Sequence, residues 1–211
     1  MPYIIRPPKL LNPPQLLGGA LAAFAAVLLF GAGSAHAEQL STSACQAPEL
    51  SRPFLNSNDS NYYMLAPGQQ NGGFEGQGWT LSGGATVKKA VLPNNKTGSV
   101  LDLPSGSVAV SPVICVSTEF PVARTMVRDV VGSEGVFFNV SYAGTSTWEN
   151  PKNTGQVHGH GSEWSASDRV NMQPENVFGW QLVKITLVAG GNPSNPSDFQ
   201  VDGLYIDPYR R

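Results

Sequence analysis

The chain has 211 residues, which is enough for one domain with a substantial core. Only 13% of the residues are charged, whereas 23 glycines and 17 prolines accompany 41% hydrophobic residues. This combination excludes a coiled coil or a long-helix bundle and predicts an all-β protein with many short strands. A net charge of −2 excludes a basic nucleic-acid binder, because phosphate binding requires clustered Lys and Arg.

The N-terminal residues have the three-part pattern of a secretory signal peptide. Arg6 and Lys9 precede an uncharged apolar run over residues 16–30, and Ala35 and Ala37 follow at the positions that a signal peptidase reads. The apolar run is short for a membrane span, which needs about 20 residues. We therefore expect residues 1–37 to be a signal peptide and the protein to be secreted, either extracellular or associated with the cell envelope. The alternative is an uncleaved N-terminal anchor.

The mature chain contains no second apolar run of membrane length, so no membrane span is expected in it. It contains both cysteines, Cys45 and Cys115. An even pair in an exported protein predicts a disulfide, which would tie a polar lead-in segment (residues 38–60) to the middle of the chain. Closing a loop of this length would stabilise the fold by about 4 kcal/mol in the chain-entropy model. The alternative is two unlinked buried thiols.

Short runs of strand-forming residues, separated by Gly, Pro and Asn, fill residues 61–211 and predict a sandwich or a barrel. The expected strands are residues 62–65, 74–81, 85–91, 99–103, 108–116, 125–131, 135–143, 168–172, 178–189 and 199–207. Pro112 interrupts the fifth run and confines part of it to an edge or bulge.

The hydrophobic period within these runs is two, as in strands with one buried face. Residues 136, 138, 140 and 142 are apolar with polar residues between them, and residues 101 and 103 flank Asp102 in the same way. Between residues 199–201 and 204–206 the apolar phase slips by one position, which predicts a β-bulge at Asp202 and Gly203.

The segment over residues 144–167 is polar and has weak strand periodicity. We expect a long loop with one strand around residues 156–158, and loops of this length are often functional. The competing interpretation is an irregular pair of edge strands.

Several motifs carry a family resemblance. The run Asn-Gly-Gly-Phe-Glu at residues 71–75, followed by Trp79, resembles the first strand of jelly-roll carbohydrate-binding modules. The whole mature chain resembles a group of small exported actinobacterial β-sandwich proteins of unassigned function. The matching residues are Cys45, Pro48, Leu50, Asp59, Tyr62, Phe74, Glu75, Trp79, Gly83, Gly84, Ala85, Ser111, Pro112, Cys115, Val116, Asp202, Tyr205, Asp207 and Pro208. Gly203 departs from the pattern, which has Asp there.

The resemblance implies a single antiparallel jelly-roll (galactose-binding-like) β-sandwich. It also implies a structural calcium ion held by Glu75 and Asp202 with help from Asn71. The side chains of these residues offer oxygen atoms, and calcium takes six to eight oxygen ligands. The alternative is that Glu75 only accepts a hydrogen bond at a strand end and that Asp202 is exposed.

Residue patterns for catalysis are sparse. His158 and His160 would share one strand face and could begin a zinc or copper site, but a solvated loop is the alternative that we favour. A Gly-x-Ser-x-Gly elbow and an acid-x-acid pair are absent from the sequence, and Asp102, Glu119 and Glu134 are dispersed as on a solvated surface. A Ser–His–Asp triad is not testable from sequence, since its members meet only in space. We expect no enzymatic activity.

Aromatic residues suggest a binding function. Tyr62, Tyr63, Trp148 and Trp164 lie in polar, turn-rich contexts where their rings could stack on sugars, whereas ordinary packing under loops is the alternative. We expect Trp79 and Trp180 to be in the core. The leading hypothesis is non-catalytic binding of a glycan or cell-envelope component. The alternative is an envelope-associated structural or protein-interaction domain with no small ligand.

Overall fold

The computed structural model describes residues 41–70, 73–117, 122–144, 147–172 and 179–207. The chain divides into two units, Met1–Ala37 and Glu38–Arg211, and all the described residues belong to the second. The predicted signal peptide over residues 1–37 therefore lies outside them. Across the described ranges, no helix has the length and apolar character needed to cross a membrane.

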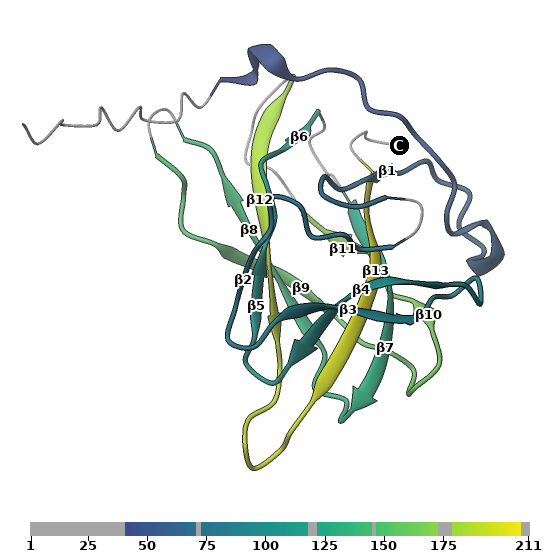
Figure 1. Ribbon diagram of the computed structural model, residues 1–211. Coiled ribbons are helices and arrows are strands. Elements are labelled where there is room, and N and C mark those ends of the chain that lie inside the picture. Colours follow the sequence, from purple (N-terminus) through teal and green to yellow (C-terminus); the bar gives the residue numbers. More distant parts are fainter. Residues whose placement is uncertain (1–40, 71–72, 118–121, 145–146, 173–178, 208–211) are drawn as a thin grey trace, which may run out of the picture. The chain divides into compact units, whose positions relative to one another are not determined.

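Two antiparallel sheets form the described part of the chain (Figure 1). The seven-stranded sheet has the order β10 (Ser165–Ala166), β7 (Val122–Val131), β13 (Asp198–Asp207), β4 (Thr97–Pro104) and β3 (Thr86–Val91), with β1 (Met64–Leu65) beside β13 and β11 (Val170–Asn171) beside β7. The six-stranded sheet has the order β2 (Thr80–Ser82), β5 (Val108–Val110), β12 (Gln181–Ala189), β8 (Val136–Tyr142) and β9 (Lys152–Val157), with β6 (Ile114–Val116) beside β12.

The chain crosses repeatedly from one sheet to the other. Strands β3 and β4 belong to the seven-stranded sheet, β5 and β6 to the six-stranded sheet, and β7 to the first sheet again. Strands β8 and β9 then belong to the six-stranded sheet, and β10 and β11 to the seven-stranded sheet. Strand β12 returns to the six-stranded sheet, and β13 ends in the seven-stranded sheet. Neighbouring strands are therefore often distant in sequence, as in a jelly-roll sandwich, and the predicted fold class is confirmed.

The core lies between the two sheets and is built from alternate positions of the long strands. The side chains at 136, 138, 140 and 142 of β8 and at 183, 185 and 187 of β12 are buried, as their spacing predicts. Leu101 and Leu103 of β4 and Phe199 of β13 meet them from the seven-stranded sheet. Full burial of one such side chain contributes roughly 1.5–3 kcal/mol.

The predicted bulge in the last strand is confirmed. The β13–β7 register shifts between Asp202 and Leu204, and Gly203 has a φ of 70°. A side chain at this position would collide with the ring of Tyr205, so the bulge requires glycine.

Glycine and proline shorten two of the expected strands. Residues 74–81 form a strand only over Thr80–Ser82, because Gly76 and Gly78 have positive φ and the Trp79 N–H bonds to the Gly76 carbonyl in a turn. Residues 108–116 split into β5 and β6 on either side of Pro112, which has no N–H for the ladder.

The polar segment over residues 144–167 contains two edge strands rather than a loop with one. Strand β9 borders the six-stranded sheet, and β10 borders the seven-stranded sheet. The expectation of a single strand around residues 156–158 was therefore wrong, because the segment has two strands and the first of them begins at Lys152. The competing interpretation of two edge strands is correct. Their few apolar residues gave little period-two signal, because edge strands are partly solvated on both sides.

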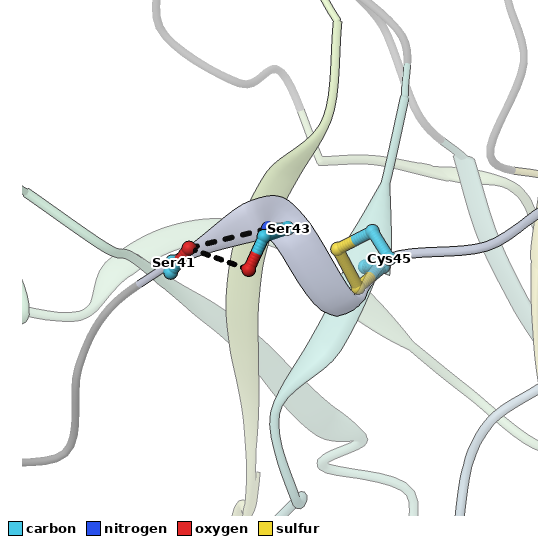
Figure 2. The surroundings of a disulfide bond; sticks show 4 residues. Ser41, Ser43 and Cys45 are labelled. Atoms are coloured by element: carbon cyan, nitrogen blue, oxygen red, sulfur yellow. Dashed lines mark hydrogen bonds between the residues drawn. A yellow bond between two sulfur atoms is a disulfide. The ribbon is translucent and has the colours of Figure 1, made fainter.

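The lead-in segment contains two short 3₁₀ turns, η1 (Thr42–Ala44) and η2 (Leu55–Ser57). The predicted disulfide is present between Cys45 and Cys115 of β6, with the two Cα atoms 5.7 Å apart. Figure 2 shows Cys45 directly after η1, where Ser41 accepts a hydrogen bond from the Ser43 N–H. The bridge spans 70 residues of sequence and fixes the lead-in segment to the six-stranded sheet.

A buried carboxylate fixes the same segment to the seven-stranded sheet. Asp59 is 2% exposed and accepts hydrogen bonds from the Tyr63 hydroxyl (2.7 Å), from Arg124 (2.8 Å) and from Arg169 (2.9 Å). Burial raises the pKa of this carboxyl, but the hydrogen bonds from Tyr63, the Asn61 N–H, Arg169 and Arg124 outweigh it and hold the pKa well below its usual value. Asp59 therefore stays ionised and joins both arginines to the lead-in segment.

Replacing this carboxylate should destabilise the fold. We expect Asp59→Asn to lower the free energy of unfolding by about 3 kcal/mol, because two arginines lose their buried counter-ion. Urea denaturation of the disulfide-intact protein measures this, with Asp168→Asn, an exposed acid, as the matched control. Equal stability of the two variants would contradict this assignment.

The pH dependence of the unfolding free energy provides a second test of the role of Asp59. Because the folded-state pKa of Asp59 is lowered, its contribution is complete above the unfolded pKa of about 4 and disappears as the pH falls below that value. Urea midpoints measured from pH 6 to pH 2 should therefore fall less steeply for Asp59→Asn than for the unmodified protein. Parallel curves would show that Asp59 does not carry the acid sensitivity.

Candidate functional site on the outer face of the six-stranded sheet

The outer face of the six-stranded sheet presents two rows of side chains that cross five strands. Because inward positions of these strands fill the core, the positions between them face away from it. The strand registers align Thr80, Val110, Thr186, Asn139 and Asn153 in the first row. They align Ser82, Val108, Val188, Phe137 and Gln156 in the second row. We call these ten residues the outer rows.

The outer rows are uncharged and rich in hydrogen-bonding groups. Three of the ten side chains are carboxamides and three are hydroxyls. The amide of Asn153 donates to the Asn139 oxygen at 3.4 Å, and the amide of Asn139 lies 3.5 Å from the Thr186 carbonyl. These contacts are long and leave hydrogen-bonding capacity for a ligand, since each carboxamide has two donors and one acceptor oxygen.

Aromatic rings lie at the two ends of this surface. Phe137 is 37% exposed on β8. Trp148 is half-buried beyond the other end of β8, where it pairs with Ala143, and the ammonium of Lys184 lies 4.4 Å from its ring centroid. Lys184 stands opposite Ser141, four residues along β8 from Phe137, which corresponds to about 13 Å of strand.

The four aromatic residues singled out in the sequence do not converge. Tyr62 is 39% exposed beside the lead-in segment, and the guanidinium of Arg52 lies 4.0 Å from its ring centroid. Tyr63 is fully buried and bonded to Asp59, so the expectation that its ring is available to a sugar is wrong. Tyr62, the residue before it, faces solvent because the side chains of successive residues in an extended chain point in opposite directions.

Trp164 lies over the other sheet. Its indole N–H donates to the Val91 carbonyl at 2.8 Å, and Arg128 lies 4.8 Å from its ring centroid. This half-buried side chain joins the segment before β10 to the end of β3. Trp79 is in the core as predicted, whereas Trp180 is only half-buried and is not a core residue.

The outer face of the seven-stranded sheet is occupied by its own polar contacts. Asp102 was expected on a solvated surface, but it is 2% exposed, bonded to Lys88 (2.6 Å) and to the Gln200 amide (3.0 Å). The Gln200 oxygen accepts two hydrogen bonds from Arg128. Side chains on four adjacent strands therefore satisfy one another on this face.

Two of the three residues expected to hold calcium lie within the described ranges. Glu75 is exposed and lies 3.5 Å from the Ser99 hydroxyl, whereas Asp202 is half-buried on β13. Burial raises the pKa of Asp202 to about 6. Asn71 lies outside the described residues, so the calcium site remains a prediction.

The histidine pair lies on the surface. His158 and His160 are both exposed in the loop after β9, and the ring of His158 lies 3.3 Å from the Ser133 carbonyl. Within the residues that the structure describes, no group of three or more His, Cys, Asp or Glu side chains is close enough to hold a metal ion.

The outer rows were not identified from the sequence, although part of the signal was present. The alternation in residues 136–142 and 183–187 places Asn139 and Thr186 on the outward side. The cross-strand register that aligns Asn153, Thr186 and Val110 with Asn139 depends on strand order, and a single sequence does not supply it.

No protein-family profile and no curated protein matches the chain. Among solved structures, it is similar to the CBM22-1 and GH10 modules of Clostridium thermocellum endo-1,4-β-D-xylanase 10B, complexed with xylohexaose, with a TM-score of 0.43 and 15% identity. That match covers 62% of this chain and only 26% of the xylanase chain.

Two smaller structures are also similar to this chain. The CBM22-1 xylan-binding domain of Paenibacillus barcinonensis Xyn10C has a TM-score of 0.42 and 15% identity, over 64% of this chain and 88% of that one. A carbohydrate-binding module of Cellvibrio mixtus lichenase 5A, complexed with cellotriose, has a TM-score of 0.40 and 13% identity, over 63% and 92%.

The raised pKa of Asp202 predicts a pH effect of opposite sign to that of Asp59. The folded state holds the Asp202 proton more tightly than the unfolded state, so stability should decrease as the pH rises from about 4 to about 6. Asp202→Asn should remove this decrease in stability. At pH 7 its free energy of unfolding should exceed that of the unmodified protein by roughly 2 kcal/mol. Thermal unfolding at pH 4 and pH 7 measures the difference, and a variant that is no more stable at pH 7 would contradict it.

Proposed function

We propose that the protein is a secreted, non-catalytic binding module that acts outside the cell or at its envelope, and that the outer rows bind a neutral glycan. One observation carries the proposal: the outer rows form an uncharged surface of amides, hydroxyls and apolar side chains that includes the exposed Phe137 ring, and Trp148 lies beyond it next to Lys184. Sugar hydroxyls pair with both donors and acceptors, which carboxamides supply together.

The apolar members of the outer rows fit the same ligand. Val110 and Val188 lie between the polar side chains and would contact the apolar C–H faces of sugar rings. Phe137 would stack on one end of the glycan. Trp148 would do so at the other end with the ring face that Lys184 does not cover.

The uncharged character of the outer rows also supports a non-catalytic role. Glycoside cleavage ordinarily requires two carboxyl groups that flank the scissile bond. None of the ten side chains of the outer rows is ionisable at neutral pH. The basic and apolar N-terminal pattern of residues 1–37 supports export.

Affinity electrophoresis through gels that contain xylan, mixed-linkage β-glucan, galactan or mannan tests the proposal. We expect retention by at least one of these neutral polysaccharides. The double variant Asn139→Ala/Asn153→Ala should bind roughly thirtyfold more weakly, because each amide contributes about 1 kcal/mol. Binding should persist in EDTA, since the outer rows offer no carboxylate to a metal ion.

Tyr62→Ala is the matched control, because it removes an exposed ring away from the outer rows. Its affinity should equal that of the unmodified protein. Loss of binding in Tyr62→Ala with retention in the double asparagine variant would overturn the assignment to this face. Absence of retention by every polysaccharide, with the fold verified by circular dichroism, would overturn the proposed function itself.

A further inference from the structure

A groove of about 820 Å³ lies away from the outer rows, at the position where the lead-in segment passes both sheets. Residues 46–51 of the lead-in segment, strand β1 with the residues after it, and residues 113–115 at β6 line this groove. The Cys45–Cys115 disulfide holds the lead-in segment to the β6 side (Figure 2). The groove therefore has one wall from each sheet and a fixed third wall.

The β1 wall exposes an unpaired main-chain edge. The Ala66 N–H bonds to the Leu204 carbonyl and Met64 pairs with Ile206, so Leu65 directs its own N–H and C=O away from β13. On that outward side Tyr63 exchanges two hydrogen bonds with Ser51 of the lead-in segment (2.8 and 2.9 Å).

The lead-in segment does not continue this ladder. Within the described part of the chain, the Leu65 N–H and C=O have no hydrogen-bond partner, although Leu65 is the next outward residue after Tyr63. Leu65 lines the groove together with Glu49 and Leu50 of the lead-in segment.

The β6 wall of the groove also exposes a main-chain edge. Ser111 bonds through its N–H to the Ile185 carbonyl, and Ile114 pairs with Val183, so Cys115 directs its main-chain groups away from β12. Among the described residues these groups also have no partner. Unpaired strand edges of this kind are templates for an added strand.

The side chains of the groove favour a peptide with a basic residue. Leu50, Met64 and Ile114 provide apolar lining. Glu49 is the only charged residue among the described residues that line the groove. It is exposed and forms no ion pair with another described residue. Among the described residues that line the groove there is no aromatic ring for stacking on a sugar, in contrast to the outer face of the six-stranded sheet.

We propose that this groove is a docking site for an extended peptide segment of a protein partner, which adds a short strand to the Leu65 edge and places a Lys or Arg side chain beside Glu49. Main-chain pairing supplies affinity that is independent of sequence, and the apolar lining and the carboxylate supply selectivity. This site is separate from the proposed glycan face and does not depend on it.

Selection from a phage-displayed library of random twelve-residue peptides tests the proposal on the full-length, disulfide-intact protein. We expect enriched peptides to carry a basic residue among alternating apolar residues. The synthetic form of an enriched peptide should bind Glu49→Lys at least tenfold more weakly, as expected for loss of a charge-assisted contact. Glu163→Lys, which alters an exposed acid elsewhere, should bind the peptide with unchanged affinity.

A second readout separates main-chain pairing from simple charge attraction. Single N-methylation along the peptide should reduce binding at least tenfold at alternate positions, because only every second N–H of a paired strand faces the protein edge. Absence of enriched peptides, equal binding by Glu49→Lys, or indifference to N-methylation would overturn the proposal. Displacement of the peptide by a polysaccharide from the glycan panel would also overturn it, since the groove would then belong to a glycan site.

Discussion

Each long strand of this sandwich must give its inward side chains to the space between the sheets, and the other features of the molecule follow from that constraint. Inward positions on β8, β12, β4 and β13 are buried and apolar almost without exception. What remains for interaction with other molecules is the outward set of side chains and the edges that the sheets leave unpaired. The two outer faces differ sharply in how their side chains are used.

On the seven-stranded sheet, charged and polar side chains pair with one another. Asp102 binds Lys88 and Gln200, Gln200 binds Arg128, and Trp164 lies against Arg128. On the six-stranded sheet, the outer rows contain amides, hydroxyls and apolar groups with few mutual contacts. A face that satisfies its own polar groups has little to offer a ligand, whereas the outer rows retain donors and acceptors.

The lead-in segment forms part of the second region for which we propose a ligand. Asp59 and the disulfide anchor it to different sheets, and the groove between these anchors borders the main-chain groups of Leu65 and Cys115, which have no hydrogen-bond partner among the described residues. Ligands of two classes are thus proposed for two separate regions: a glycan on a broad uncharged face, and an extended peptide at a strand edge. The chemistry of each region, rather than the fold, distinguishes them.

The sequence was sufficient for features that depend on local pattern. Period-two alternation identified the inward residues of β8 and β12, and the phase slip located the bulge at Gly203. The cysteine count, in a chain expected to be exported, predicted the disulfide. Features that depend on strand order were not predictable. Burial of Asp102 requires Lys88 and Gln200 on neighbouring strands.

The same limitation explains the aromatic residues. Polar sequence context indicated exposure for Tyr63 and Trp164 alike. Tyr63 is buried, and its hydroxyl donates a hydrogen bond to Asp59, four residues earlier. Trp164 is held by a carbonyl that lies 73 residues away in sequence. A polar neighbourhood in sequence therefore describes the chain around a ring and not the tertiary contacts that cover it.

The most direct test of the central claim is an NMR titration of the ¹⁵N-labelled protein with a neutral oligosaccharide derived from a polysaccharide that retains it. The account predicts that the side-chain amide signals of Asn139, Asn153 and Gln156 shift with ligand, while the Trp164 indole N–H signal stays in place. Shifts confined to Trp164 or to the main-chain signals of Leu65 and Cys115, with the three amides unchanged, would contradict it.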